Sequence, residues 1–145
     1  MKNIHELPLR IGVGIALLNH ENKVFVGKRI DNPVNFWQMP QGGVDKNEEN
    51  YEAAKRELRE ETGYSAKKLT NIGKFWTAPG FCDELIYVYL AEDLRYEPLP
   101  SDIDEDIETI EIKLTEANEK IINGTITDSK TISALNMFSL FRNLN

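Results

Sequence analysis

The segment 42–64 constrains this chain more than any other part of it. It reads GGVDKNEENYEAAKRELREETGY and places Glu57, Glu60 and Glu61 behind a pair of glycines. Positions i, i+3 and i+4 lie on one face of a helix, where like charges repel each other. A divalent cation removes that repulsion, because Mg²⁺ binds oxygen ligands, usually one or two carboxylates together with substrate phosphates. The segment therefore predicts a metal site that faces a phosphorylated substrate.

The local pattern predicts a loop followed by a helix. Asn47 is expected to cap the start of the helix, and Gly63 to end it in the left-handed conformation. An apolar stripe should pack the helix on a sheet. It consists of Tyr51, Ala54 and Leu58.

The same residues match the Nudix box, G-x5-E-x7-R-E-U-x-E-E-x-G-U, in which U is an aliphatic residue. The matching positions are Gly42, Glu48, Arg56, Glu57, Leu58, Glu60, Glu61 and Gly63. One position departs from the pattern, because Tyr64 replaces the final aliphatic residue. The chain resembles a Nudix hydrolase, and the likeness in order and length extends over nearly all of it.

This resemblance implies a metal site in the box. The family's metal ligands carry over to Glu57, Glu60 and Glu61, with Glu57 and Glu61 as the main ligands. Glu60 would hold a further metal or accept the proton of the attacking water. A backbone carbonyl of Gly42 or Gly43 would add another oxygen ligand. Mg²⁺ is the expected cofactor, with Mn²⁺ as the alternative.

Three further residues receive supporting roles. The resemblance implies that Glu48 and Arg56 stabilise the box, with Arg56 orienting a ligand carboxylate. In the branch that hydrolyses ADP-ribose, a glutamate in a downstream loop assists catalysis, and Glu105 in the acidic run 102–106 matches it best. A solvated run of charges is an equally good interpretation of that loop. A non-catalytic Nudix binding module is the alternative to an enzyme, but all the box carboxylates are present.

Upstream of the box the chain resembles one branch of the family. Segments 7–14, 26–29 and 37–43, the last reading WQMPQGG, resemble bacterial dinucleoside polyphosphate hydrolases and RNA 5′-pyrophosphohydrolases. In this interpretation Lys28 and Arg29 clamp phosphates and Trp37 stacks near a base, while Gln41 also contacts the substrate. A solvated basic pair and a core tryptophan are the alternatives.

Downstream of the box the resemblance changes. The stretch APGF with Pro79 and Phe81 resembles the ADP-ribose pyrophosphatases, as do segments 104–107 and 124–131. We expect no long N-terminal extension of the kind that many such enzymes use to dimerise, and no basic, aromatic downstream segment of the kind expected of an RNA-end enzyme. The first hypothesis is a dinucleoside polyphosphate or an RNA 5′ end as substrate, and ADP-ribose is the alternative.

Composition indicates the class of protein, its partners and its compartment. The 145 residues predict one domain, 1–145, and 41% hydrophobic with 28% charged residues is typical of a globular protein. A net charge of −7 disfavours long RNA and favours a small nucleotide partner. The single cysteine, Cys82, is expected to be buried and fits a reducing compartment. The sequence contains no candidate membrane span or signal peptide, so we expect the protein to be cytoplasmic. The sequence leaves open whether it is a monomer or a homodimer.

The remaining pattern predicts an α/β fold, namely an α/β/α sandwich with a mixed sheet. Segments 10–18 and 23–28 are expected to form a hairpin, followed by a short strand at 37–39. The continuous apolar run 85–90 predicts a strand that is buried on both faces. This strand is expected to span 84–90, and further strands are expected at 68–76 and 109–114. Helices are expected at 115–123 and after Asp128, the second with Ile132, Leu135 and Phe138 inward.

Overall fold

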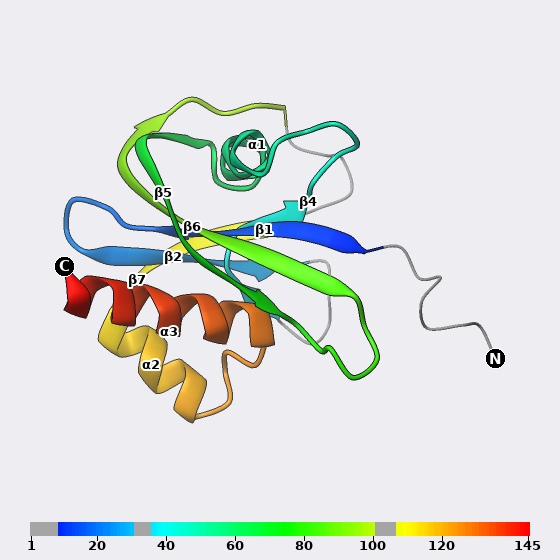
Figure 1. Ribbon diagram of the computed structural model, residues 1–145. Helices are drawn as coiled ribbons and strands as arrows, with labels where there is room; N and C mark the ends of the chain where they lie inside the picture. The colour runs from blue at the N-terminus through cyan, green and yellow to red at the C-terminus, as the bar shows by residue number, and fades with distance from the viewer. Residues whose placement is uncertain (1–8, 31–35, 101–106) are drawn as a thin grey trace.

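The protein folds as three layers. The computed structural model describes residues 9–30, 36–100 and 107–145. Helix α1 (Asn50–Thr62) covers one side of the strand layer, and α2 (Leu114–Ile122) and α3 (Ser129–Leu144) lie on the other side (Figure 1). The predicted α/β/α sandwich is confirmed.

A four-stranded mixed sheet forms the centre of this arrangement. Its order is β4-β1-β6-β5, made of Gln41–Gly43, Arg10–Leu17, Glu84–Tyr96 and Tyr64–Trp76. Strands β1 and β6 run parallel, whereas β4 and β5 pair antiparallel to their neighbours. The segment 85–91 is buried apart from the half-buried Tyr87, as expected of a strand that is covered on both faces.

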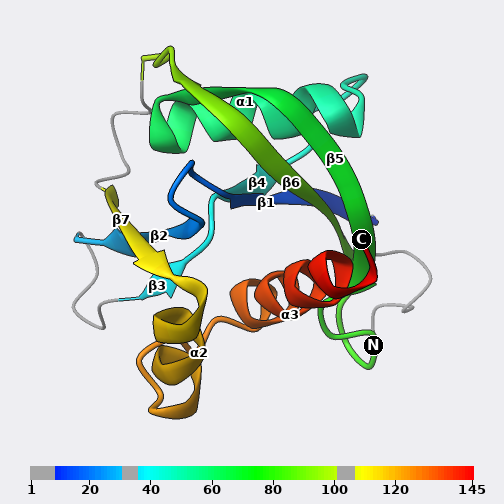
Figure 2. The ribbon, with the colours of Figure 1, turned by 90° about the vertical axis from the view of Figure 1, so that its left-hand side faces the viewer.

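A second sheet of three antiparallel strands has the order β3-β2-β7, formed by Trp37–Gln38, Lys23–Arg29 and Ile107–Lys113. The predicted hairpin between 10–18 and 23–28 is therefore wrong, because β1 and β2 belong to different sheets and share one bridge, Leu18 with Val24. Both edges of β1 are occupied by β4 and β6, which leaves β2 to pair elsewhere. In Figure 2, α2 lies beside this second sheet and α3 beneath the first.

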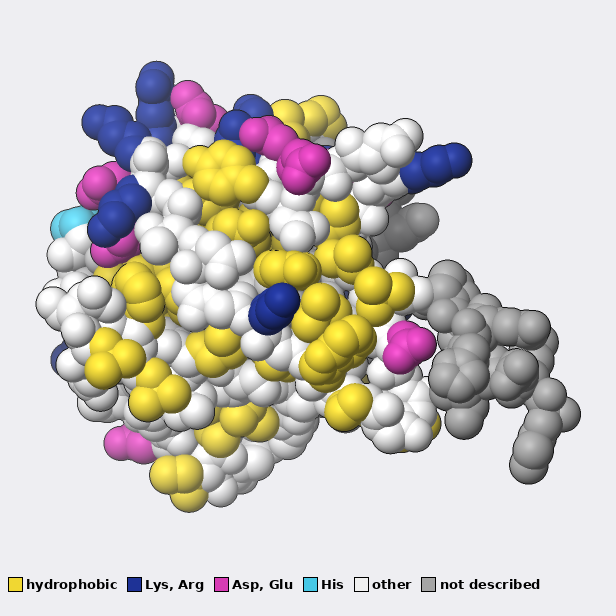
Figure 3. Space-filling view, in the orientation of Figure 1, with side chains coloured by type: hydrophobic (Ala, Val, Ile, Leu, Met, Phe, Trp, Pro, Cys, Tyr) yellow, Lys and Arg dark blue, Asp and Glu magenta, His cyan; other side chains and the backbone are white. Residues whose placement is uncertain are grey.

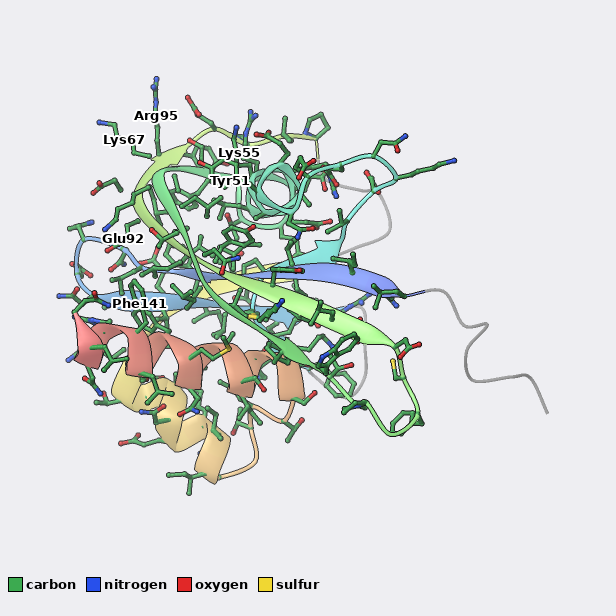
Figure 4. All side chains as sticks on the ribbon, viewed as in Figure 1. Tyr51, Lys55, Lys67, Glu92, Arg95 and Phe141 are labelled. Carbon is green, nitrogen blue, oxygen red and sulfur yellow. The ribbon has the colours of Figure 1, made fainter. Side chains whose placement is uncertain are left out.

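Helix α1 follows the predicted bounds more closely at its end than at its start. Gly63 ends it in the left-handed conformation (φ 77°), which confirms that prediction. The cap lies at Glu49, so the assignment to Asn47 is wrong: Asn47 adopts a positive φ of 66° in the preceding turn. Tyr51 is 45% exposed rather than inward. Its ring forms a T-shaped pair with the ring of Tyr89, with the centroids 6.3 Å apart, and its centroid lies 5.6 Å from the Lys55 Nζ (Figure 4).

The hydrophobic core lies on both sides of the strand layer. Ala53, Ala54 and Leu58 of α1 pack against β1 and β6, and Leu135 and Phe138 of α3 pack on the opposite side. Cys82 is half-buried in the β5–β6 turn, so the expectation of a buried thiol is wrong.

The face in Figure 3 carries hydrophobic side chains across its centre and along the β5–β6 hairpin, with Lys and Arg gathered over the start of β5 and the end of β6. None of the helices in the described ranges is both long enough and apolar enough to cross a membrane.

Candidate functional site

A cavity of about 500 Å³ opens where α1 faces β4. Its acidic lining residues are Glu57, Glu60, Glu61 and Glu84, and its basic ones are Arg10, Arg29, Arg56 and Lys130. The backbone of Gly42 and Gly43 forms another part of its wall. Helical spacing places the three box glutamates on the side of α1 that faces this strand.

Arg56 holds the two sides of the site together. Its Nε and Nη2 donate to the two carboxylate oxygens of Glu48, each at 3.0 Å. Nη1 donates to Glu57 Oε1 at 2.8 Å and to Glu60 Oε2 at 3.0 Å, and Nη2 also donates to the Gly43 carbonyl at 3.0 Å. The planar guanidinium is suited to such a task because its donors point in fixed directions. One side chain thus joins the 43–48 loop to the acidic face of the helix.

The charge state of this pair follows from the same contacts. The hydrogen bond from Arg56 is the main cause that lowers the pKa of Glu48 below its ordinary range, and the Asp45 N–H adds to it while burial opposes it. In return, Glu48 and then Glu57 raise the pKa of Arg56. Glu48 therefore remains a carboxylate over a wider pH range than an isolated glutamate.

Gly42 lies directly against the carboxylate of Glu57. A Cβ at Gly42 would overlap the carboxylate of Glu57, a residue that is only 9% exposed. The N–H of Gln41 donates to Glu61 Oε2 at 3.1 Å. Glycine at position 42 is thus required by the close approach of strand and helix, not by an unusual backbone angle.

The donor set suits a hard divalent cation. It consists of oxygen atoms alone, from Glu57, Glu60, Glu61 and the backbone carbonyls of the glycine pair. Among the described residues no three His, Cys, Asp or Glu side chains already converge as a metal cluster. Arg56 contacts two of the carboxylates and the Gly43 carbonyl, so these oxygens are grouped around a cation, here the guanidinium.

The predicted substrate residues fall into two groups. Arg29 and Gln41 line the cavity. Lys28 and Trp37 lie elsewhere: the Lys28 Nζ is 6.0 Å from the Trp37 ring, which packs against the core beside α2. Successive strand residues point to opposite faces, so Lys28 and Arg29 cannot both face the same cavity.

The other predicted positions lie away from this cavity or outside the description. Pro79 and Phe81 belong to the segment between β5 and β6, and Phe81 is 83% exposed. Neither is among the described residues that line the cavity. Glu105 lies outside the described residues.

Sequence reasoning assigned no role in the site to several lining residues, namely Arg10, Gln38, Glu84 and Lys130. Arg10 and Glu84 are register partners at the start of β1 and β6, and their side chains pair at 3.5 Å. Lys130 comes from α3, far from the box in sequence. Arg10, Gln38 and Lys130 lie in the segments 7–14, 37–43 and 124–131 that carry the family resemblance, and this was the signal that could have found them.

Comparison with known proteins identifies the family of this chain. A family profile described as "NUDIX domain" matches residues 8–135. The chain therefore belongs to the NUDIX family.

Two curated relatives differ in their named substrates. The chain is 37% identical over 132 residues to an "ADP-ribose pyrophosphatase" of Bacillus subtilis (strain 168), which covers 88% of this chain and 71% of that protein. It is 57% identical over 88 residues to an "RNA pyrophosphohydrolase" of Pelagibacter ubique (strain HTCC1062), covering 61% of this chain. The match spans 50% of that relative, about half its length.

One solved structure supports the fold. It is titled "Crystal structure of ADP compounds hydrolase" and superposes with a TM-score of 0.83, covering 94% of this chain and 74% of that chain. At 24% identity this likeness shows the fold alone.

Proposed function

We propose that this chain is a metal-dependent pyrophosphohydrolase that cleaves a pyrophosphate bond in a nucleoside diphosphate linked to another moiety. One observation carries the proposal: Glu57, Glu60 and Glu61 line one cavity together with the Gly42–Gly43 backbone and several cationic side chains, and the Glu57 carboxylate lies directly against Gly42. Such a cavity combines the acidic groups that bind a divalent cation with basic groups that bind phosphate.

Each part of the cavity has a task in the proposed reaction. Arg29 and Lys130 attract the phosphate chain and offset its negative charge. Glu57 and Glu61, with a carbonyl of Gly42 or Gly43, would hold Mg²⁺ or Mn²⁺, which when bound stabilises the charge on the phosphoryl oxygens. Glu60 would either hold a further metal or accept the proton of the attacking water. Arg56 keeps the Glu57 carboxylate and the Gly43 carbonyl in place.

The proton of the attacking water needs an acceptor. Glu60 is our candidate because its half-buried carboxylate lines the cavity. The water oxygen then bonds to phosphorus, the bridging oxygen–phosphorus bond breaks, and two phosphorylated products leave. Glu105 is the second candidate for this task, on the resemblance of its loop alone.

The substrate contains a nucleoside diphosphate linked to another moiety, and we rank two candidates for it. A dinucleoside polyphosphate or an RNA 5′ end comes first, supported by the 57% identity with an RNA pyrophosphohydrolase. ADP-ribose comes second, supported by the alignment with an ADP-ribose pyrophosphatase that covers 88% of the chain. The net charge of −7 weighs against long RNA.

A substrate panel tests this proposal. Diadenosine tetraphosphate, ADP-ribose and 5′-triphosphorylated RNA are incubated with the protein and Mg²⁺, and each product is quantified. A preference of about tenfold or more for ADP-ribose, a difference of 1.4 kcal/mol in transition-state binding, reverses the order of the two candidates. Failure on all three refutes the substrate class.

A matched pair of variants tests the site. Glu61→Gln should abolish turnover, as should EDTA, whereas Glu52→Gln should leave it unchanged. Glu52 lies on the same helix with a side chain 58% exposed, paired with Lys55 instead of facing the cavity. Tight nucleotide binding without turnover by the unmodified protein would favour a binding module.

A further inference from the structure

Thr131 connects the far side of the fold to the segment that leads into the site. It lies in the first turn of α3 and is fully buried (0% exposed), and the one other buried polar side chain among the described residues is Glu57. Its hydroxyl donates to Asp128 Oδ2 at 2.7 Å and accepts the Met39 N–H at 2.9 Å. Because Met39 is two residues before β4, this hydrogen bond attaches α3 to the segment that leads into Gly42 and Gly43.

The direction of this hydroxyl is fixed by its neighbours. An ionised carboxylate accepts hydrogen bonds but donates none, so the Thr131 O–H points at Asp128 and leaves a lone pair for Met39. Asp128 also accepts the Thr131 N–H at 2.9 Å as the cap of α3, and its other oxygen lies 3.2 Å from the Lys130 Nζ. One carboxylate thereby orients both the buried hydroxyl and a cation that lines the cavity.

The segment 39–43 is held from three directions. Thr131 binds its first N–H, and β1 binds the next carbonyl, since the Ile15 N–H donates to the Pro40 oxygen at 2.9 Å. From α1, Glu61 accepts the Gln41 N–H and Arg56 donates to the Gly43 carbonyl. The anchor at Thr131 lies opposite the two from α1, so it resists displacement of the strand toward or away from the carboxylates.

We propose that Thr131 is a positioning residue of the active site, which with Asp128 sets the place of the Gln41–Gly43 backbone relative to Glu57 and Glu61. This inference rests on the proposed function, because its main readout is the hydrolysis assigned there. Thr131 touches no reacting atom. It acts through the Met39 N–H, and a buried N–H that loses its acceptor shifts to find another.

Two substitutions isolate the hydroxyl. Thr131→Val keeps the branched shape and removes the oxygen, whereas Thr131→Ser keeps the oxygen. We expect Thr131→Val to lower kcat about 10- to 100-fold, the cost of a displacement of up to about 1 Å at an active site. KM should change by less than about threefold, and Thr131→Ser should restore kcat to within about threefold of the unmodified protein.

Ser139→Ala is the matched control. Ser139 is half-buried on the same helix, and its hydroxyl donates to the Leu135 carbonyl at 3.0 Å, away from the segment 39–43. Its loss should leave kcat unchanged. Hydrogen exchange adds a readout that needs no turnover: the amides of Met39 and Gln41 should exchange faster in Thr131→Val alone.

The outcomes separate the two proposals. An unmodified protein that hydrolyses no nucleotide of the panel refutes the proposed function and this inference with it. If the unmodified protein turns over and Thr131→Val has an unchanged kcat, this inference alone is refuted. It is also refuted if Thr131→Ser loses as much kcat as Thr131→Val. If Thr131→Val does not fold, Asp128→Asn replaces it. Asn still caps the helix but weakens the bond that directs the hydroxyl, and an unchanged kcat there overturns the inference.

Discussion

Replacing Gly42 by alanine is the sharpest test of how the strand and helix fit together. Neither Gly42 nor Gly43 is among the glycines with a positive φ, so the backbone permits alanine at both. A Cβ at position 42 would overlap the carboxyl carbon and both oxygens of Glu57, whereas no described atom lies within 4 Å of a Cβ at position 43. The two adjacent substitutions therefore add the same methyl group to very different surroundings.

The size of the effect follows from the overlap. To regain ordinary van der Waals contact, the Glu57 carboxylate has to retreat by roughly 1 Å or more, and a displacement of that size in an active site lowers the rate by about 100-fold. This corresponds to about 2.7 kcal/mol of activation free energy. The retreat also disturbs the 2.8 Å contact between Glu57 and Arg56. We expect Gly43→Ala to retain kcat within about threefold, because its methyl group enters open space.

The assay is the rate of nucleotide hydrolysis with Mg²⁺ for both variants, normalised to folded protein by circular dichroism. A Gly42→Ala variant with a kcat close to that of the unmodified protein would refute the reasoning. Equal losses of kcat in the two variants would also refute it, because the loss in Gly42→Ala could then not be attributed to the overlap with Glu57.

Two further predictions concern the Arg56 contacts. Arg56→Lys should lower the free energy of unfolding by about 2 kcal/mol in urea titrations, because a lysine cannot reproduce the fork that reaches Glu48, Glu57 and the Gly43 carbonyl; an unchanged midpoint contradicts this. Glu48→Gln should flatten the loss of stability in acid. The lowered pKa of Glu48 gives a contribution that is complete above its ordinary value of 4.5 and is lost as pH falls through the lower folded-state value. Parallel stability curves below pH 4.5 for the two proteins would show that Glu48 contributes nothing of this kind.

The sequence predicted the parts of the structure that depend on local spacing. The box helix, its end at Gly63 and the acidic face of α1 follow from offsets of three and four residues and from a glycine-specific conformation. The continuous apolar run of β6 likewise predicted a strand covered on both sides. Together with the other expected strands and the two C-terminal helices, these segments predicted a three-layer sandwich.

The parts that depend on distant pairing could not be predicted in the same way. Strands β1 and β2 are neighbours in sequence, but β6 and β4 occupy both edges of β1. A period of two predicts that Lys28 and Arg29 face opposite ways, but only the pairing of β2 with β3 and β7 decides which one faces the cavity. Lys130 reaches the site because α3 packs beneath the central sheet.

The division of the strands into two sheets makes catalysis a sensitive reporter of partial unfolding. Strand β3 pairs with β2 in one sheet and β4 pairs with β1 in the other, and only Met39 and Pro40 separate β3 from β4. Any separation of the two sheets has to pull on this short link, which leads directly into β4 with Gly42 and Gly43. Loss of turnover in a denaturant titration should then precede the loss of secondary structure, because the link is disturbed before either sheet melts.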